Sequence, residues 1–389
     1  MQTLKTWLPV FVGICCLALG PGMMAIYGFF VEPLSKEFGV GVVVLNVGPV
    51  ALLLVPAFLG ALVGKLADRL PVRNLLLIGA SLGMLSLLAI GEAPTLMLVA
   101  LGFISFSFGM MFYGPVVVNG MMVKLFPGRE ARALALAAMG MSLAAIVLPP
   151  MAGTLLNYFD WRAALQIMAA GLLVLLWLVI LAGVPRGSVV QAAVGERQHT
   201  GAFYRVGSFW LIGFSVALAL NVMIVVAVCF PPLFIDRGYS VADAGWFVSI
   251  SGLAGLAGKS CLAWLGDAAR HLAKWLAAGM LVMQIAGLVL LYLASDVWLV
   301  LVALSMLGMA NGAFIPMHPY LNSRYFDAAI ISQVTGAQMP LFLPFGLIGA
   351  PLAGYVYDRT GSYEVVLIAL AVVLAVAALL LLRLPAVDK

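Results

Sequence analysis

Residues 60–73 read GALVGKLADRLPVR, and part of this stretch returns as AWLGD at residues 263–267. Measured between their aspartates, the two copies are offset by 267 − 68 = 199 residues. A second echo has nearly the same spacing, because PMAG at residues 150–153 and PLAG at 351–354 are offset by 351 − 150 = 201 residues. Two separate offsets that agree this closely indicate an internal repeat of about two hundred residues. The sequence therefore predicts two similar halves.

The composition predicts that both halves lie in a membrane. Apolar residues make up 65% of the chain and charged residues 9%, and the mean hydropathy is +1.16, all far outside the range of soluble domains. A net charge of +5 would suggest nucleic-acid binding in a soluble protein, but membrane topology accounts for it better here. The four cysteines lie in apolar runs without metal-ligand spacing, so we expect no metal, cofactor or disulfide framework.

Apolar runs of membrane-spanning length, bounded by charges or turn residues, predict an all-α protein with twelve transmembrane helices. Their extents are 7–31, 42–63, 74–91, 95–123, 133–156, 163–184, 206–233, 244–265, 274–293, 297–320, 329–355 and 364–384. With a cytoplasmic N-terminus, the outer loops hold only the basic residues Lys36, Arg162, Arg237 and Arg359. This distribution predicts that both termini are cytoplasmic. We expect the protein to lie in the plasma (inner) membrane.

The one long polar connector, residues 185–205, divides the chain into six-helix bundles at residues 1–184 and 206–389. We expect the connector to be cytoplasmic and the bundles to surround a central cavity. No GxxxxGK[ST] loop occurs in the sequence, so no ATPase motor or subunit is evident. Parallel six-helix repeats are typical of secondary transporters, whose halves rock around a central site.

The stretch at residues 60–73 resembles the loop motif of the major facilitator superfamily, and the repeat extends this resemblance over essentially the whole chain. The resemblance implies a conformational latch, formed by Gly60, Gly64, Asp68, Arg69 and Arg73 and by Asp267 in the second copy. Glycines allow close helix approach, while an aspartate accepts hydrogen bonds at a helix end and arginines pair with acidic groups. The alternative is that these are ordinary topology charges. This chain has Pro71 where the family usually has Gly, and it lacks Arg after Asp267.

A narrower resemblance is to the monocarboxylate transporter and oxalate/formate antiporter branches. It is carried by YGFFVEPL at residues 27–34 and by FPGREARALA at residues 126–135, which is followed by Gly140. In those branches the eighth helix commonly bears an Arg eight residues before the acidic residue of the next loop. Counting back from Asp267 reaches Lys259. The resemblance implies that this position holds a substrate carboxylate, here by a point charge rather than a bidentate fork.

Lys259 is also the one charged residue that falls well inside a membrane-length apolar segment. At 1.5 Å per residue it lies about 12 Å from Asp267, near the centre of a core of about 30 Å. The sequence places no carboxylate at this depth. An intramembrane cation is a functional hypothesis by default, and an anionic substrate would supply the counter-charge. The alternative is that Lys259 snorkels to the inner interface.

The same depth count selects further candidates for substrate binding, and each has a structural alternative. Tyr113 is either a ligand contact or a packed aromatic residue. Asn311 and Gln338 either contact the substrate or form hydrogen bonds between helices. His318, nearer the inner surface, is either a site residue or a satisfied polar group. Tyr27 is either in the site or an interface aromatic residue.

These observations predict a secondary active transporter that moves small organic anions, monocarboxylates above all, by alternating access, with a possible coupled proton or counter-anion. The alternative is an exporter of drugs or other amphipathic compounds, in which the Met and Phe residues line an adaptable cavity. An enzyme is not expected, because three scattered histidines without paired carboxylates supply no catalytic constellation. A receptor that binds without transport stays open as a third class.

Overall fold

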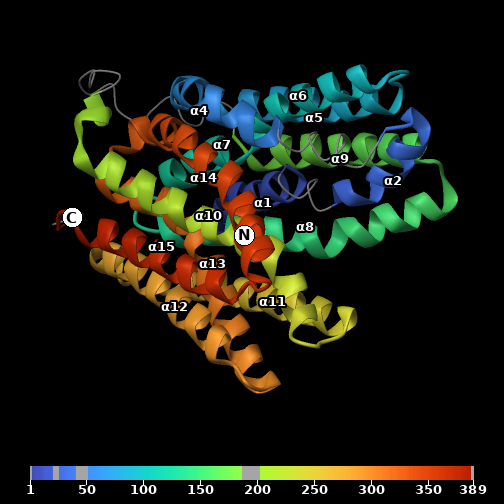
Figure 1. Ribbon diagram of the computed structural model, residues 1–389. Helices are drawn as coiled ribbons and strands as arrows, with labels where there is room; N and C mark the ends of the chain where they lie inside the picture. Colours follow the sequence, from blue (N-terminus) through green and yellow to red (C-terminus); the bar gives the residue numbers. More distant parts are fainter. Residues whose placement is uncertain (1, 21–25, 41–50, 186–201, 387–389) are drawn as a thin grey trace. The chain divides into compact units, whose positions relative to one another are not determined.

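A computed structural model describes residues 2–20, 26–40, 51–185 and 202–386, and within these residues the secondary structure is helical throughout. Figure 1 shows long helices joined mostly by short connections. In the part of the chain so described, ten helices are long and apolar enough to cross a membrane, and Thr6–Leu19 forms a shorter apolar helix. The number twelve stays a prediction, because residues 21–25 and 41–50 of the first two expected spans lie outside the described residues.

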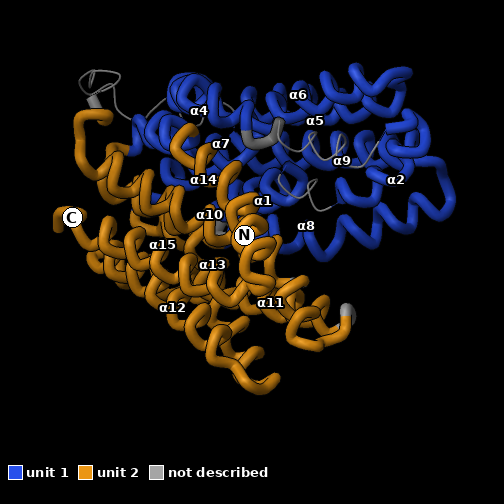
Figure 2. Tube along the Cα trace, in the orientation of Figure 1, with its two compact units in different colours: residues 1–127, 136–195, 328–339 blue, residues 128–135, 196–327, 340–389 orange. Residues whose placement is uncertain are grey.

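The described residues divide into two compact units, drawn in different colours in Figure 2. Unit 1 comprises residues 1–127, 136–195 and 328–339. Its helices are α1 (Gln2–Leu19), α2 (Tyr27–Phe38), α4 (Ala51–Arg69), α5 (Val72–Gly91), α6 (Leu96–Tyr113), α7 (Pro115–Leu125), most of α8 (Glu130–Tyr158) and α9 (Trp161–Gly183). It also contains the 3-10 helix η5 (Ala328–Ile330) and the first turns of α14 (Ile331–Thr360).

Unit 2 comprises residues 128–135, 196–327 and 340–389. Its elements are η3 (Ala202–Arg205), α10 (Gly207–Asp236), α11 (Val241–Leu265), η4 (Arg270–Leu272), α12 (Ala273–Leu293), α13 (Val297–Tyr325), most of α14 and α15 (Glu364–Leu382). The first residues of α8 belong to it as well. Each unit thus includes the beginning of one helix that continues in the other unit. Most of the expected linker, residues 186–201, lies outside the described residues, and the bundle limits 1–184 and 206–389 stay predictions.

Polar residues fix where several of these helices begin. The Asp160 carboxylate accepts a hydrogen bond from the backbone N–H of Ala163 at 2.9 Å, at the start of α9. Ser240 and Asp243 form a reciprocal capping box at the start of α11, which satisfies backbone donors that have no partner within the helix. At the other end of a helix, Gly39 closes α2 in the left-handed conformation with φ of 62°, which glycine adopts without strain.

Two expected spans differ from the observed helices. The run 95–123 is interrupted at Gly114, which has extended backbone between α6 and α7. Pro115 follows in the first turn of α7, where its missing N–H costs no helical hydrogen bond, and its ring disfavours a helical conformation of the residue before it. The two helices together still form one candidate span, Leu96–Leu125, as expected. The run 7–31 contains the end of α1 at Leu19 and the start of α2 at Tyr27, and α2 continues past this run to Phe38.

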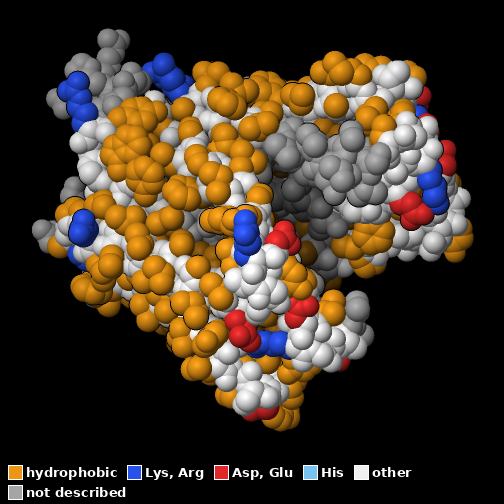
Figure 3. Space-filling view, in the orientation of Figure 1, with side chains coloured by type: hydrophobic (Ala, Val, Ile, Leu, Met, Phe, Trp, Pro, Cys, Tyr) orange, Lys and Arg blue, Asp and Glu red, His pale blue; other side chains and the backbone are white. Residues whose placement is uncertain are grey.

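Hydrophobic side chains cover most of the face shown in Figure 3, and charged side chains appear there only in small groups. Large apolar residues are exposed on many helices, with Phe58 76% and Trp264 78% exposed. A soluble protein rarely exposes apolar patches of this extent. The surface therefore suits a lipid environment, in agreement with the spanning length of the helices.

Candidate functional site

Lys259 lies on α11 in unit 2, and only 4% of the residue is exposed. It occupies the last third of the candidate span Asp243–Leu265. Immediately before it, Gly258 packs against the backbone of Met309 on α13 so closely that a Cβ at Gly258 would overlap the Met309 carbonyl oxygen. The lysine is therefore held at a tight helix crossing. Full snorkelling to an interface would leave much more of the side chain exposed.

The α11–α13 crossing depends on a set of small residues that the sequence reasoning did not use. A Cβ at Gly308 would overlap the Ser251 carbonyl oxygen, and a Cβ at Gly312 would overlap that of Gly255. Small residues spaced four apart are a recognised signal of close helix approach in membranes. The spacing of Gly308 and Gly312 was thus visible in the sequence and predicts this contact.

Two predicted site residues lie on α13, in the same unit as Lys259. The side-chain oxygen of Asn311 is buried and accepts no hydrogen bond from the described residues. His318 is 7% exposed; its Nε2 lies 3.2 Å from Nδ2 of Asn322, and its ring meets that of Phe342 edge-on at 5.5 Å. His318 therefore has the surroundings of a satisfied polar residue, which was the structural alternative for it, whereas Asn311 retains unused hydrogen-bonding capacity.

The other three predicted substrate contacts lie in unit 1. Gln338, on the first turns of α14, is fully buried. Tyr27 is partly exposed on α2, and its ring packs edge-on against Phe103 at 5.4 Å. Tyr113, at the end of α6, is fully buried, and a Cβ at Gly83 would lie 3.3 Å from its hydroxyl. That hydroxyl has no hydrogen-bond partner among the described residues.

Asn221 and Gln284 are buried polar residues that the sequence reasoning missed. Asn221 is near the middle of α10, and its side-chain oxygen lies against Gly349 of α14, where any larger residue would collide with it. Gln284, on α12, is 1% exposed, and neither its oxygen nor its nitrogen has a hydrogen-bond partner in the described parts of the chain. The available signal was a single amide side chain within an apolar helix, the same signal that selected Asn311.

Asp68, at the end of α4, caps the N-terminus of α14 within unit 1. Its carboxylate accepts hydrogen bonds from the backbone N–H of Ser332 at 3.3 Å and of Gln333 at 2.8 Å. These are early donors of a helix, where an anion is favoured by both hydrogen bonding and the helix dipole. Lys124 of α7 donates to the same carboxylate at 2.7 Å, and both side chains are 5% exposed.

Gly60 and Gly64 allow α14 to approach this cap. A Cβ at Gly60 would lie 2.6 Å from the Gly336 carbonyl oxygen, and one at Gly64 would overlap that of Ser332. Both glycines are therefore required for the packing. Arg69 is exposed and Arg73 partly exposed, and neither has a hydrogen bond or ion pair within the described residues, so their role stays a prediction. Lys124 was missed because the sequence assigned it only to the positive-inside bias.

Asp267 makes the corresponding cap in unit 2. Its carboxylate accepts hydrogen bonds from the N–H of Ala131 at 2.8 Å and of Arg132 at 3.2 Å, at the start of α8. Burial raises the pKa of this carboxyl, and the two backbone hydrogen bonds act in the opposite direction. The missing arginine after Asp267 therefore does not prevent the second copy from holding a helix N-terminus.

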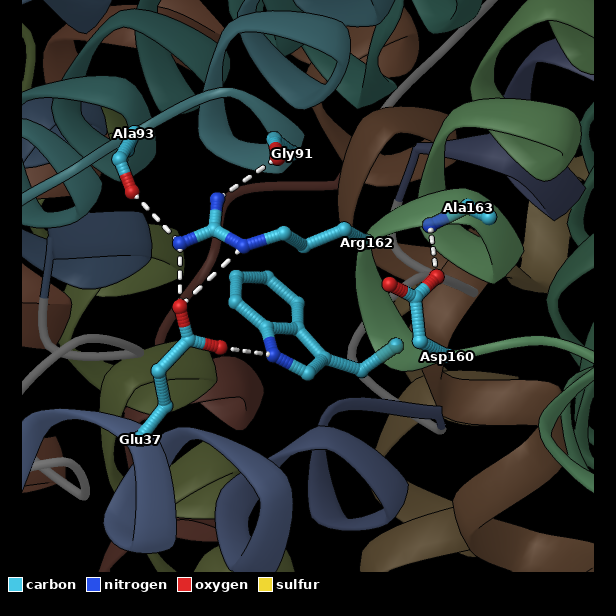
Figure 4. Close-up of polar contacts among 7 residues, drawn as sticks. Glu37, Gly91, Ala93, Asp160, Arg162 and Ala163 are labelled. Atoms are coloured by element: carbon cyan, nitrogen blue, oxygen red, sulfur yellow. Dashed lines mark hydrogen bonds and ion pairs between the residues drawn. The ribbon is translucent and has the colours of Figure 1, made fainter.

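At the opposite end of unit 1, a polar cluster joins three helices (Figure 4). Arg162, at the start of α9, donates to Glu37 of α2 at 2.5 Å and to the carbonyl oxygens of Gly91 and Ala93, beside the end of α5, at 2.7 and 2.8 Å. The Trp161 indole donates to the other Glu37 oxygen at 2.5 Å. The hydrogen bonds from Arg162 and then from Trp161 hold the pKa of Glu37 below its ordinary value.

Unit 2 has a related cluster at the end of α10. Arg237 donates to the carbonyl oxygen of Leu291 on α12 at 2.8 Å. Its Nη2 lies 3.5 Å from the carboxylate of Glu364 on α15, an ion pair without a hydrogen bond. Arg237 therefore links the ends of three helices, as Arg162 does in unit 1.

Comparisons with known proteins agree with this architecture. The family model described as "Major Facilitator Superfamily" matches residues 10–342 and, in a second alignment, 209–389. "Monocarboxylate transporter 13" of Bos taurus is 28% identical over 298 residues, which cover 73% of this chain and 66% of that protein. "Monocarboxylate transporter 11" of Homo sapiens is 26% identical over 316 residues, covering 77% of this chain and 65% of that protein. The chain thus spans just under two thirds of the length of these two relatives.

Among solved structures, the transporter FucP in the outward conformation superimposes with a TM-score of 0.75 at 14% identity. The alignment covers 97% of each chain. At this identity the likeness concerns the fold alone.

Proposed function

This chain belongs to the Major Facilitator Superfamily, and from that premise we propose that it is a secondary transporter of small organic anions, monocarboxylates above all. The observation that carries the proposal is Lys259, a cation buried to 4% exposure within a membrane-spanning helix. An ionisable side chain inside a membrane span marks a functional site by default. The relatives named as monocarboxylate transporters, at 26–28% identity, indicate carboxylates as the anion class.

In this proposal Lys259 attracts the substrate carboxylate. Asn311, in the same unit, has a side-chain oxygen without a partner among the described residues, which can accept a hydrogen bond from the hydroxyl group of a bound hydroxy acid. Tyr113, in unit 1, has a hydroxyl without such a partner, which can donate to a carboxylate, and its part in the same site stays a prediction. A lysine is a point charge that holds one carboxylate oxygen without the bidentate geometry of arginine. This favours small acids, for which charge rather than shape supplies most of the recognition.

We further propose that Asp68 and Asp267 are latches of alternating access. Asp68 holds the N-terminus of α14 and Asp267 that of α8, in each case a helix from the other half of the sequence. The hydrogen bonds of each cap can break and form again together. Both aspartates lie beside connections that carry basic residues. The positive-inside bias therefore predicts that these connections, like both termini, are cytoplasmic. The plasma membrane is the proposed location.

Uptake into proteoliposomes tests the substrate proposal. Labelled lactate, pyruvate and formate are compared for the wild type and for Lys259→Gln, Lys259→Arg and Lys36→Gln. Lys36 is a matched control, because it is 75% exposed and pairs only with Glu32. We expect Lys259→Gln to lower uptake about tenfold or more, since a hydrogen bond to a charged group contributes about 1.5–3 kcal/mol. Lys259→Arg should keep part of the uptake, and Lys36→Gln all of it.

Equal uptake by Lys259→Gln and the wild type would remove Lys259 from the site. Specific binding without flux in the same vesicles would indicate a receptor, and resistance to amphipathic drugs without acid uptake would indicate the exporter alternative. Coupling is decided by imposing either a pH gradient or an internal load of unlabelled acid. Stimulation by the gradient indicates proton symport, and stimulation by the load indicates exchange.

A further inference from the structure

An apolar groove lies within unit 2 where α11 and α12 both pack on α13. These two helices barely touch each other, although each contacts α13 extensively, so α13 forms the floor of the gap between them. The cavity has a volume of about 350 Å³. Its lining consists mainly of small residues and flexible sulfur-containing side chains, namely Gly258, Cys261, Gly279, Met280, Met283 and Met309.

The groove opens to the outside of the protein along α12. Gly279 is exposed, and a Cβ added there would meet no atom within 4 Å. Leu272 is 41% and Trp275 57% exposed at the end of the groove nearest η4. From Leu272 to Met283 the α12 side of the groove is about 16 Å long, roughly half of a hydrocarbon core of about 30 Å. Its length therefore matches one leaflet rather than the whole bilayer.

Basic side chains gather at this same end. Arg270 and His271 form η4 with Leu272, and both are exposed. Lys274 lies one turn further on, with its ammonium 5.6 Å from the centre of the Trp275 ring. Tryptophan and basic side chains at one level mark the headgroup region of a bilayer. The groove thus combines an apolar channel of one leaflet's depth with positive charge at its headgroup end.

We propose that this groove binds an anionic phospholipid from the leaflet beside the α11–α12 connection, which the basic residues predict to be the cytoplasmic one. One acyl chain lies between α11 and α12 on the floor of α13, and the headgroup phosphate lies at Arg270 and His271. Methionine side chains adapt to an irregular chain, and the small residues make room for it. Because Gly258 lines the groove and Lys259 follows it, the lipid contacts α11 at the turn that carries the buried lysine.

Native mass spectrometry of the full-length purified protein tests the proposal, with dioleoylphosphatidylglycerol and dioleoylphosphatidylcholine as probes. Gly279→Leu fills the groove with a side chain that the surroundings have room for. Gly171→Leu is its control, because Gly171 is also exposed on a spanning helix with nothing within 4 Å of an added Cβ. Arg270→Gln removes headgroup charge, and Arg205→Gln removes an exposed cation elsewhere in unit 2.

We expect the wild type to bind phosphatidylglycerol more tightly than phosphatidylcholine, and Gly279→Leu to lose most of this binding. Arg270→Gln should weaken phosphatidylglycerol binding about fivefold, the effect of one cation at a membrane surface, and weaken phosphatidylcholine binding less, because the choline cation offsets the charge of its phosphate. Both controls should match the wild type. Equal binding of the two lipids, or undiminished binding by Gly279→Leu, overturns the proposal. Should Gly279→Leu not fold, the exposed Arg270→Gln variant decides alone. Binding is the readout, so the result is independent of the transported substrate.

Discussion

Asp68 in unit 1 and Asp267 in unit 2 occupy equivalent positions of the repeat and make the same contact in different surroundings. Each accepts hydrogen bonds from two early backbone N–H groups of a helix. Asp68 also forms a buried ion pair of 2.7 Å with Lys124, whereas burial raises the pKa of Asp267. The helix cap is thus what the repeat preserves, and the balance between burial and countercharge differs between the units.

The opposite helix ends extend this comparison, because there the charges are reversed. Glu37 and Arg237 are offset by 237 − 37 = 200 residues, and Arg162 and Glu364 by 364 − 162 = 202. Both offsets fall on the repeat, and so does the carbonyl acceptor, since 291 − 91 = 200. An acid on α2 of unit 1 corresponds to a base at the end of α10 in unit 2, and the partner is exchanged accordingly. What persists is the electrostatic link among three helix ends, rather than the residue at any one position.

Among substitutions that test this comparison, we expect the largest effect at Asp68. We expect Asp68→Asn to lower the free energy of unfolding by about 3–5 kcal/mol, because it leaves the Lys124 ammonium buried without its ion-pair partner. Denaturant titration of the purified protein measures this loss, with Asp267→Asn measured in parallel. The double variant Asp68→Asn/Lys124→Met should recover most of the loss and keep only the cost of a weakened cap, about 1 kcal/mol. Equal losses for Asp68→Asn and Asp267→Asn would contradict the difference drawn between the two caps.

The reversed clusters provide a smaller test. Arg162→Gln should cost about 1.5–3 kcal/mol, since Arg162 is 25% exposed and donates to a carboxylate and two carbonyls. Glu364→Gln should cost at most about 1 kcal/mol, because Glu364 is 50% exposed and its ion pair is long. Thermal melting of both variants gives the ranking. A larger loss for Glu364→Gln would show that the two clusters are not energetically arranged as their geometry indicates.

The loss of stability caused by Arg162→Gln has a pH dependence of known sign. The pKa of Glu37 is lowered in the fold by Arg162 and Trp161, so its contribution to stability is present above its unfolded pKa and is lost as pH falls through its folded pKa. The difference in melting temperature between the wild type and Arg162→Gln should therefore shrink as the medium is acidified. A difference that grows on acidification would exclude Glu37 as the partner that matters.

The sequence predicted the helical class and most spans, because the length of an apolar run is a local property. The repeat spacing singled out Asp68 and Asp267, whose role as latches stays a prediction. It missed the break at Gly114, where Pro115 interrupts an otherwise continuous apolar run, and it missed the pairing of Lys124 with Asp68. Such pairings join residues far apart in the sequence, and a single chain carries no signal of which charge meets which. Lys259 is buried on a candidate spanning helix, and its place in a substrate site stays a prediction.

The smallest expected effect is at Asp267, because burial and hydrogen bonding shift the pKa of its carboxyl in opposite directions. Burial raises its pKa more than the Ala131 and Arg132 N–H groups lower it. A group with a raised folded pKa contributes stability that is present below its unfolded pKa and lost as pH rises through the folded pKa. The advantage of the wild type over Asp267→Asn in melting temperature should therefore be largest near pH 4 and decrease toward pH 7. Asp68→Asn is the control, since the ion pair with Lys124 should keep its deficit large at neutral pH. An advantage of Asp267 that grows toward pH 7 would mean that the two N–H donors outweigh burial, and the two caps would then be held by the same balance of forces.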